Sequence, residues 1–539
     1  MKRTLAVLIA ISILLLALSG CDEEISQAFV YDIDSNPENL DPQTSDSAGA
    51  NIVISNTMEG LVSFDENGDL RLGAAESYTV SEDGLTYTFS LKRNRKWVDY
   101  KGASYGQVTA ADFLFAFQRL FDTATGSVHA SDFSCLEGAA AILVGEATID
   151  DLGISISDLY TVAFKLAYSN AHFLELLATP AAMPCNRTFF LETKGTYGLD
   201  NTALLYNGPF YLGSWNLSRS QLVLYRSDHY STDSGEPIAA EAVTLSILSE
   251  GEDGFERFTN GDTDAIIVTD EHIEQIDINQ YTNKEKEDSV WVLVFNNSHP
   301  VLANKKIRQA LAASLDHDSQ EAYLASWMNP AGALVPHSVA GGVDVTYRAL
   351  VGEDLAVAYD LETAKQLLNE GLTQLGLTEF PKVTVLYPDN EAYTNLLQQL
   401  QRQWQTNLSI FVNISPVSQG AVFGAVESQE YDIAMLPLRT QTNHPSYLLS
   451  MFTTSSTKNV SRYYSIAYDG LINEALNSQD EEASMMLFGE AEQVLINDVA
   501  IIPVAYQVTY YITNKAIDGI RFSEYGDTIL FKYAQRLTP

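Results

Sequence analysis

Catalytic residues of hydrolases leave short motifs in a sequence, and the common motifs are absent here. The chain has no Gly-x-Ser-x-Gly turn for a serine nucleophile and no His-Glu-x-x-His helix for zinc. His272 follows Glu271 without a second histidine four residues on, and the eight histidines are scattered. His317 lies between Asp316 and Asp318 at the end of an expected helix, where the helix dipole favours a protonated histidine at the surface. These residues predict neither catalysis nor a metal site.

The charge balance argues against nucleic acid as a partner. The chain has 539 residues, with 31 Lys and Arg against 70 Asp and Glu, a formal net charge of −39. Phosphate backbones repel so acidic a protein. Hydrophobic residues make up 46% of the sequence, enough for a large core, so the composition also argues against disorder. At roughly 100–200 residues per domain, the length indicates about two to four lobes.

The N-terminus looks like the signal sequence of a bacterial lipoprotein. Met1-Lys2-Arg3 is basic, and the run from Leu5 to Leu18 is almost entirely apolar. Because this run is shorter than the roughly 20 residues of a membrane-spanning helix, it predicts a secretory signal peptide over residues 1–20. The run ends in Leu18-Ser19-Gly20-Cys21, which looks like a lipobox, so we expect acylation of Cys21. The alternative is a signal peptide followed by an incidental cysteine.

Acylation would tether the mature protein to the extracytoplasmic face of a bacterial cell membrane. No later stretch reaches about 18 apolar residues, so the rest of the chain is expected outside the bilayer. Cys135 and Cys185 would then lie in an oxidising compartment. They predict either a disulfide or two buried thiols.

Local signals place the regular elements that would carry a site. Thr109 and Asp112 have the spacing of a capping box, and apolar residues at helical spacing follow. Asn304 is expected to cap another helix, and a helix over Asp360–Gly371 is expected to end at its glycine. Helices and strands with short connections indicate an α/β protein of several lobes. Further expected elements are strands at Phe29–Ile33 and Lys382–Tyr387, a strand pair over 207–226, a helix at Asn395–Gln405 and strands near the C-terminus.

Several sequence blocks together resemble the family 5 extracellular solute-binding proteins, the oligopeptide- and dipeptide-binding components of ABC importers. The most specific match runs from Ala74–Tyr78 through Ser81–Phe89 to Lys96-Trp97 and Thr109–Phe113. The order and spacing of the blocks hold from residue 29 to residue 525. The other blocks are Asn36–Pro42, Glu59-Gly60-Leu61, Asn207–Tyr211, Phe295–Asn297, Ile307–Leu311, Ala491–Leu495 and Ile502–Val504.

The resemblance implies a periplasmic-binding-protein-like α/β fold, a two-lobe clamp of type II (cluster C-like) with an additional third lobe. By similarity, lobe I would comprise residues 21–62, 203–290 and 500–539, lobe II, the extra domain, residues 63–202, and lobe III residues 291–499. The crossings near residues 290 and 500 would act as hinges, and a ligand held by both jaws would favour the closed state. We expect a monomer without enzymatic activity or cofactor, with ABC permease and ATPase subunits as partners.

The resemblance also implies a ligand site built from two strand edges that pair with extended peptide main chain. One edge follows the Leu-Asp-Pro turn, where this chain has Thr44, Ser45, Asp46, Ser47 and Ala48. The other corresponds to residues 437–449 and gives as candidates Leu438, Arg439, Gln441 and Asn443. Tyr506 aligns near a strand that faces the cleft in relatives, with core packing as the alternative. His129 and Phe133 of lobe II lie in a segment that approaches the ligand in relatives.

Gln441 is the most informative departure from the family pattern. Aligned on Pro445, it stands where relatives have an aspartate that pairs with the α-ammonium group of the peptide. An amide can accept a hydrogen bond from an ammonium group but cannot balance its charge, and a buried unpaired cation is costly. Either another carboxylate, such as Asp46, has this role, or the ligand is not a peptide held by a free N-terminus. Arg439 could instead meet an anionic group or be paired structurally.

The sequence therefore favours one function and leaves alternatives open. The favoured function is a lipid-anchored binding protein that captures oligopeptides by hinge closure and delivers them to a permease. Within the same fold, the ligand could be a non-peptide solute such as an oligosaccharide or a chelate. From other classes, the alternatives are a surface hydrolase and a peptide-signal receptor without transport.

Overall fold

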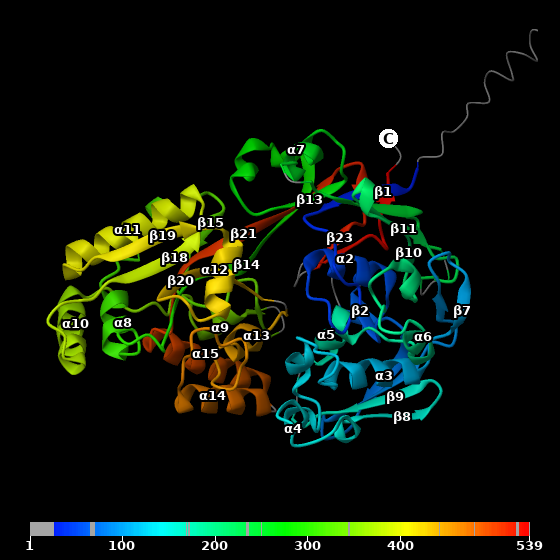
Figure 1. Ribbon diagram of the computed structural model, residues 1–539, viewed down its shortest axis with the longest axis horizontal. Helices are drawn as coiled ribbons and strands as arrows, with labels where there is room; N and C mark the ends of the chain where they lie inside the picture. Colours follow the sequence, from blue (N-terminus) through cyan, green and yellow to red (C-terminus); the bar gives the residue numbers. More distant parts are fainter. Residues whose placement is uncertain are drawn as a thin grey trace, which may run out of the picture.

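The computed structural model shows two jaws connected by two long strands (Figure 1). In Figure 1 the N-terminal and C-terminal parts of the chain form the jaw on the right, and β14 (Tyr281–Phe295) and β21 (Ile501–Asn514) run from it to the jaw on the left. Three parts of the fold, which we call lobe I, lobe II and lobe III, have separate hydrophobic cores. The structure describes residues 26–64, 70–168, 170, 173–232, 235, 237–249, 251–317, 319–342, 345–440, 442–478, 480–523 and 528–537, the side chain of residue 288 excepted.

Lobe I is built on a four-stranded sheet in the order β1-β12-β11-β10, in which β1 and β12 run parallel. Phe29, Leu224 and Phe531 are fully buried in its core, and Met183 and Tyr197 pack there as well. Its elements are β1 (Ala28–Ile33), α2 (Ala48–Thr57), α6 (Arg187–Glu192), β10 (Phe210–Asn216), β11 (Gln221–Arg226), β12 (Ala242–Ile247), α7 (Gly254–Thr259), β13 (Ala265–Val268), β22 (Ile517–Asp518), β23 (Arg521–Phe522), β24 (Ile529–Leu530) and β25 (Gln535–Arg536).

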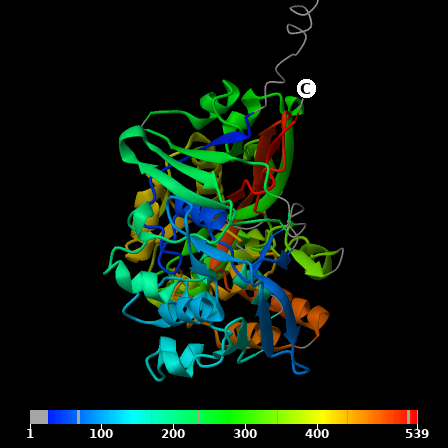
Figure 2. The same ribbon diagram turned by 90° about the vertical axis from the view of Figure 1, so that its right-hand side faces the viewer.

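Lobe II lies beneath lobe I, at the end of the jaw away from the C-terminus (Figure 2). Its antiparallel sheet has the order β4-β5-β9-β8, and α3 packs on this sheet because Phe113 and Phe117, one turn apart, both point into the core with Phe164. Its elements are β2 (Val62–Phe64), β3 (Leu70–Leu72), β4 (Ala75–Val80), β5 (Thr86–Leu91), β6 (Lys96–Val98), β7 (Ser104–Gln107), α3 (Ala110–Phe121), η1 (Ala130–Phe133), α4 (Ala139–Leu143), β8 (Ile154–Asp158), β9 (Thr161–Lys165), α5 (Phe173–Leu177) and η3 (Pro180–Ala182).

Lobe III is a sheet with helices on both faces. Alternate residues of β14 face opposite sides: Leu293 and Phe295 pack under α8, α10 and α11, whereas Val292 and Val294 pack under α12 to α15. Its elements are α8 (Lys305–Ala313), β15 (Met328–Pro330), β16 (Ala340–Gly342), β17 (Val345–Thr346), α9 (Tyr347–Val351), α10 (Leu361–Leu375), β18 (Val383–Pro388), α11 (Glu391–Leu408), β19 (Val412–Val417), α12 (Gln419–Glu427), β20 (Ile433–Arg439), α13 (Ser446–Ser450), α14 (Ile466–Asn477) and α15 (Glu481–Asn497).

The strands β14 and β21 carry the chain between the jaws. They pair antiparallel along nearly their whole length, and the pairing has register shifts between Glu287 and Ser289 and between Trp291 and Val292. Such bulges bend a strand and increase its twist, so we expect the connection between the jaws to bend there.

Most of the expected elements are confirmed. Helix α3 begins directly after Thr109, whose backbone N–H and hydroxyl both donate to the Asp112 carboxylate. Asn304 caps α8, and the strand pair over 207–226 is formed by β10 and β11. The strand expected at 29–33 lies within β1, and the helix expected at 395–405 lies within α11.

One expected helix end is wrong. Helix α10 does not end at Gly371 but continues to Leu375, where Gly376 adopts a φ of 69° as the left-handed cap. Gly371 faces α8, and a Cβ at this position would lie 2.7 Å from Ile307 Cδ1. A glycine stands here because two helices pack closely, not because the chain turns. Local sequence does not reveal this reason.

Candidate functional site

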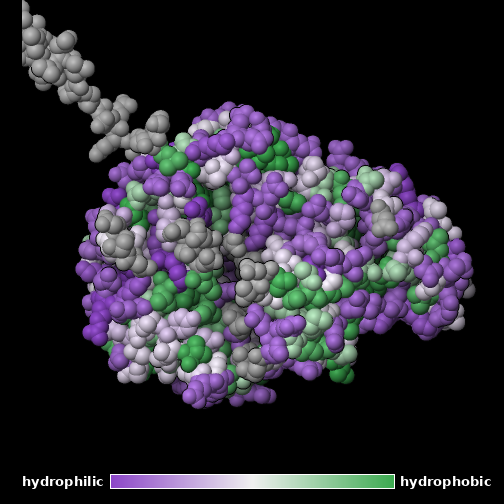
Figure 3. Space-filling model, turned by 180° about the vertical axis from the view of Figure 1, so that it is seen from behind, coloured by the Kyte–Doolittle hydropathy of each residue, from purple (hydrophilic) through white to green (hydrophobic). Residues whose placement is uncertain are grey.

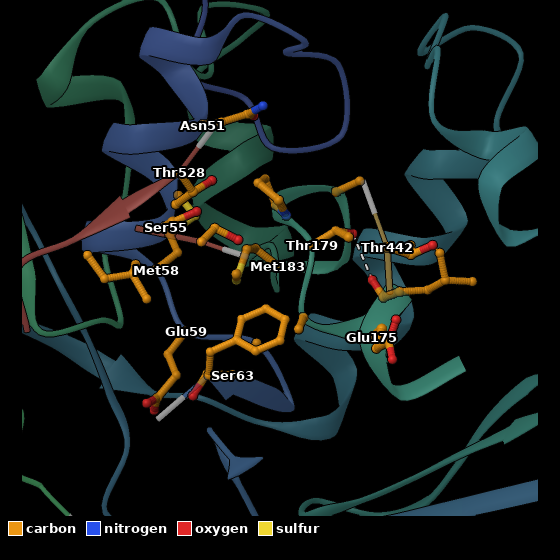
Figure 4. Close-up of a pocket in the computed structure, with 18 of the residues that line it drawn as sticks. Asn51, Ser55, Met58, Glu59, Ser63, Glu175, Thr179, Met183, Thr442 and Thr528 are labelled. Atoms are coloured by element: carbon orange, nitrogen blue, oxygen red, sulfur yellow. Dashed lines mark hydrogen bonds between the residues drawn. The ribbon is translucent and has the colours of Figure 1, made fainter. Parts of the chain in front are cut away.

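A cavity of about 360 Å³ lies between lobe III and the jaw formed by lobes I and II. Its volume falls in the roughly 300–1,000 Å³ range of ligand sites. Figure 4 shows Met58 and Thr442 facing the space from opposite sides. Lobes I and II supply most of the wall, and lobe III contributes Thr442, Asn443 and Tyr447. Hydrophilic residues cover much of the outer face seen in Figure 3.

Helix α2 forms part of the lobe I wall. Ser47 caps the helix by accepting a hydrogen bond from Ala50 N at 3.3 Å. Asn51 and Ser55 lie one turn apart and line the cavity, and Met58 follows at the helix end (Figure 4). Because the opposite side of α2 packs into the lobe I core, the helix holds these side chains toward the cavity.

Glu59, directly after α2, is the centre of a buried charge cluster on the cavity wall. Its carboxylate lies 2.9 Å from Arg95 Nε, 3.5 Å from Lys532 Nζ and 3.8 Å from Arg71 Nη2, and it accepts a hydrogen bond from the Tyr230 hydroxyl at 2.5 Å. Burial opposes ionisation of Glu59, but the neighbouring cations outweigh burial and lower its pKa. The ionised cluster joins Arg95 of lobe II to Lys532 of lobe I.

His129 and Asp132 line the cavity where the three lobes meet. His129 Nε2 lies 2.8 Å from the Ser45 carbonyl oxygen of lobe I, and its Nδ1 lies 3.7 Å from the Asp132 carboxylate. Lys458 of lobe III donates to Asp132 Oδ1 at 2.7 Å. Burial alone would lower the pKa of His129, but the neighbouring Asp132 carboxylate and the Ser45 carbonyl that accepts from the ring outweigh burial and raise it. Burial would raise the pKa of Asp132, but His129 and Lys458 lower it.

Residues 44–48, expected as an edge that pairs with the ligand, pair with no strand of the described chain. Residues 45–47 have no regular structure, and Ala48 is the first residue of α2. Ser45 is buried with its carbonyl on His129, and Ser47 is the helix cap. The segment leads into α2, whose N-cap is Ser47, and pairing of its backbone with a ligand stays a prediction. Asp46 is exposed and is the residue of this segment that lines the cavity.

The second expected segment places one of its described candidates at the cavity. Asn443 lines it, whereas Leu438 and Arg439 end β20 and do not belong to its wall. Leu438 packs beside the lobe III core, and Arg439 Nη2 donates to the Tyr511 hydroxyl at 2.9 Å. Gln441 lies outside the described residues.

Tyr506 faces the core of lobe III. It is therefore a packing residue, which was the alternative prediction, and the prediction that it faces the cleft is wrong. Its side chain is fully buried, and its hydroxyl donates to the Ala333 carbonyl at 3.0 Å. Its ring packs against His337, with 5.0 Å between the ring centres. Burial raises the pKa of Tyr506 far above its ordinary value.

Cys135 and Cys185 are separate buried thiols, so the disulfide alternative is wrong. Cys135 belongs to the lobe II core and Cys185 to the lobe I core, where its sulfur lies 3.6 Å from Arg119 Nη1. Burial raises the pKa of each thiol to about 11, which keeps both protonated and unreactive at neutral pH. Cys21 and the signal sequence lie outside the described residues.

The contact between Asp132 and Lys458 was missed by sequence reasoning. These residues are 326 positions apart, and no local pattern links them. His129 is at the cavity as the resemblance implied, whereas Phe133 is buried in the lobe II core.

In the part of the chain that the structure describes, no helix is long and apolar enough to span a membrane, and no group of three His, Cys, Asp or Glu side chains could hold a metal ion.

Known proteins match nearly the whole chain in sequence. A family model described as bacterial extracellular solute-binding proteins, family 5 middle, matches residues 69–460. The dipeptide-binding protein DppE of Bacillus subtilis is 25% identical over 488 residues, which cover 90% of this chain and 88% of that protein. The periplasmic oligopeptide-binding protein OppA of Escherichia coli is 27% identical over 506 residues, which cover 92% of this chain and 89% of that protein.

Solved structures give the same result for the fold. Listeria monocytogenes OppA bound to peptide aligns with a TM-score of 0.78 at 24% identity, covering 96% of this chain and 100% of that chain. The substrate-binding domain of an oligopeptide ABC transporter from Bacillus anthracis aligns with a TM-score of 0.79 at 26% identity, covering 95% of this chain and 99% of that chain. The expected fold class, a multi-lobe α/β clamp, is confirmed.

The family also rules out one of the alternatives. Family 5 solute-binding proteins are transport binding proteins rather than enzymes, which rules out the surface hydrolase. Since the family model covers well over half of its length, the chain belongs to the bacterial extracellular solute-binding proteins of family 5.

Proposed function

We propose that this protein is the substrate-binding component of an ABC importer and captures oligopeptides between its jaws. The observation that supports this most directly is the cavity between lobe III and lobes I and II, which a ligand can fill while it contacts both jaws. Such a ligand favours the closed state by its higher affinity for that state. The matching relatives include dipeptide- and oligopeptide-binding proteins, and one matching structure holds a peptide.

Asp46 and Asn443 are the ligand contacts that we propose from the expected segments. They line the cavity from opposite jaws, one with a carboxylate and the other with an amide. Asp46 is exposed, so its carboxylate can meet the α-ammonium group that Gln441 cannot neutralise. Ser45 and Ser47 support this wall through the contact with His129 and the cap of α2, whereas Leu438 and Arg439 lie outside it.

The remaining organisation follows from this proposal. For the lobes, we expected residues 21–62, 203–290 and 500–539 in lobe I, 63–202 in lobe II and 291–499 in lobe III. We keep these bounds except that residues 183–202 are assigned to lobe I, because Met183 and Tyr197 pack in its core. Acylated Cys21 anchors the protein to the extracytoplasmic face of the membrane, and permease and ATPase subunits receive the closed, loaded form.

Thermal unfolding with a random peptide library tests the proposal. A peptide present at about 100 times its Kd is expected to stabilise the protein by about 2.7 kcal/mol. The same peptides with an acetylated N-terminus should stabilise it much less, and the Asp46→Asn variant should lose this discrimination. No stabilisation by any peptide, together with stabilisation by oligosaccharides or chelates, would replace the peptide with a non-peptide solute. Discrimination that persists in Asp46→Asn would assign the amine contact to another carboxylate.

A further inference from the structure

The ion pair between Asp132 and Lys458 joins the two jaws directly. Among ion pairs between described residues, it is the only one that links residues 26–268 to residues 296–499. The Lys458 ammonium lies 2.7 Å from Asp132 Oδ1, and Asp132 itself lines the cavity. The pair therefore lies at the cavity and away from the strands that connect the jaws.

On the lobe III side, Lys458 is held in place by its own loop. Asn459 fastens this loop by donating to the Thr453 and Tyr463 carbonyl oxygens at 3.1 and 2.8 Å. The Lys458 ammonium also lies 5.1 Å from the centre of the Tyr447 ring, another residue of the cavity wall. A lysine positioned in this way loses less side-chain entropy when it pairs than a free surface lysine does.

On the other jaw, Asp132 is fixed by short-range contacts. It belongs to η1, a short 3₁₀ helix whose N-cap is His129. The His129 ring contacts both Asp132 and the Ser45 carbonyl of lobe I. These contacts hold the Asp132 carboxylate from within its own jaw.

We propose that Asp132 and Lys458 form a latch that holds the jaws closed around the cavity and sets how fast the ligand leaves. The latch rests on the proposed capture by closure. Both side chains keep part of their surface in water, 23% for Asp132 and 34% for Lys458, so the pair can open without leaving a buried charge. Because both charged groups belong to the protein, the pair adds to the closed state whichever ligand is bound.

Distances between spin labels on Ser155 of lobe II and Glu362 of lobe III, measured without peptide, test the latch. In Lys458→Met and in Asp132→Asn, the ratio of closed to open molecules is expected to fall roughly two- to fivefold, the range of a partly exposed pair. The double variant should fall no further than the single variants. For any peptide that the wild-type protein binds, dissociation should accelerate by the same factor.

Lys306→Met is the matched control, because Lys306 pairs with Glu370 at 2.6 Å entirely within lobe III. This variant should leave the distances unchanged. Equal distance distributions in the wild-type, Lys458→Met and Asp132→Asn proteins would overturn the latch, and so would additive effects in the double variant. Because these distances need no ligand, the latch can fail while peptide capture stands, and a lack of peptide binding by the wild-type protein would count against the proposed function alone.

Discussion

The ion pairs that lobe II makes with lobe I and with lobe III differ in burial. Toward lobe I, Arg119 of α3 pairs with Asp41, and only 8% of each side chain is exposed. Arg119 also donates to Gln43 Oε1 at 2.7 Å and lies 4.1 Å from the centre of the Phe190 ring. Toward lobe III, the Asp132–Lys458 pair is partly in water.

This difference separates a fixed joint from a movable one. A buried ion pair that is hydrogen-bonded and covered by rings cannot be opened without stranding a charge. Glu59 with Arg95 and Lys532 adds a second buried cluster to the same joint. Lobes I and II are therefore expected to move as one jaw. Lobe III joins them through the two connecting strands, and among ion pairs between described residues only the partly exposed Asp132–Lys458 pair links it to lobe II.

The largest expected effect comes from breaking the fixed joint at Arg119. Arg119→Met leaves the Asp41 carboxylate buried without its partner, so the free energy of unfolding should fall by about 3–5 kcal/mol in urea denaturation. Lys165→Met, which breaks the exposed pair with Glu137 on lobe II, is the control and should cost less than about 1 kcal/mol. A similar small loss for both variants would contradict a fixed joint.

Glu59 gives the joint a pH dependence. Its pKa is lowered in the fold, so its contribution to stability is present above its ordinary value of 4.5 and is lost as the pH falls through the lowered value. Glu59→Gln should therefore destabilise the protein by about 2–3 kcal/mol at pH 7. The difference from the wild-type protein should shrink in acid. Unfolding curves between about pH 7 and pH 3 measure this, and a difference independent of pH would show that Glu59 acts by packing alone.

His129 is expected to act in the opposite pH direction. Its pKa is raised above 6.5, so its stabilising contribution is complete below that pH and is lost as the pH rises through the folded value. His129→Ala should cost up to about 1 kcal/mol near pH 5.5 and less near pH 8. NMR titration of the imidazole provides the check, because Asp132→Asn should bring the pKa of His129 down. An imidazole pKa that does not respond to Asp132→Asn would separate His129 from the contact with lobe III.

Salt gives the smallest expected effect and distinguishes the two contacts. Raising NaCl from about 0.05 M to about 0.5 M should roughly halve the coupling free energy between Asp132 and Lys458, because water reaches this pair. The coupling between Asp41 and Arg119 should change much less. Double-mutant cycles of each pair at both salt concentrations provide the measurement. Equal salt sensitivity would mean that the two contacts are equally hydrated.

Local sequence was sufficient wherever a structural signal is completed within a few residues. The capping box at Thr109 and Asp112, the cap at Asn304 and the strand pair β10–β11 were predictable because each depends on neighbouring side chains. Gly371 was not, because the reason for a glycine there is Ile307 on another helix. Tyr506 was also undecided, since a strand residue can face either side of a sheet and the partner at Ala333 is distant in sequence.

The sequence by itself determined the family, the α/β class and most of the elements, because their signals are local or occur as ordered blocks along the chain. It also identified Asp46 and Asn443, two residues of the cavity wall. Only the tertiary structure decided that residues 45–47 lead into α2, that the two cysteines belong to different cores, and that the ion pairs of lobe II are buried toward lobe I and partly exposed toward lobe III. Burial and long-range pairing arise when distant segments come together, and spacing along the chain does not encode them.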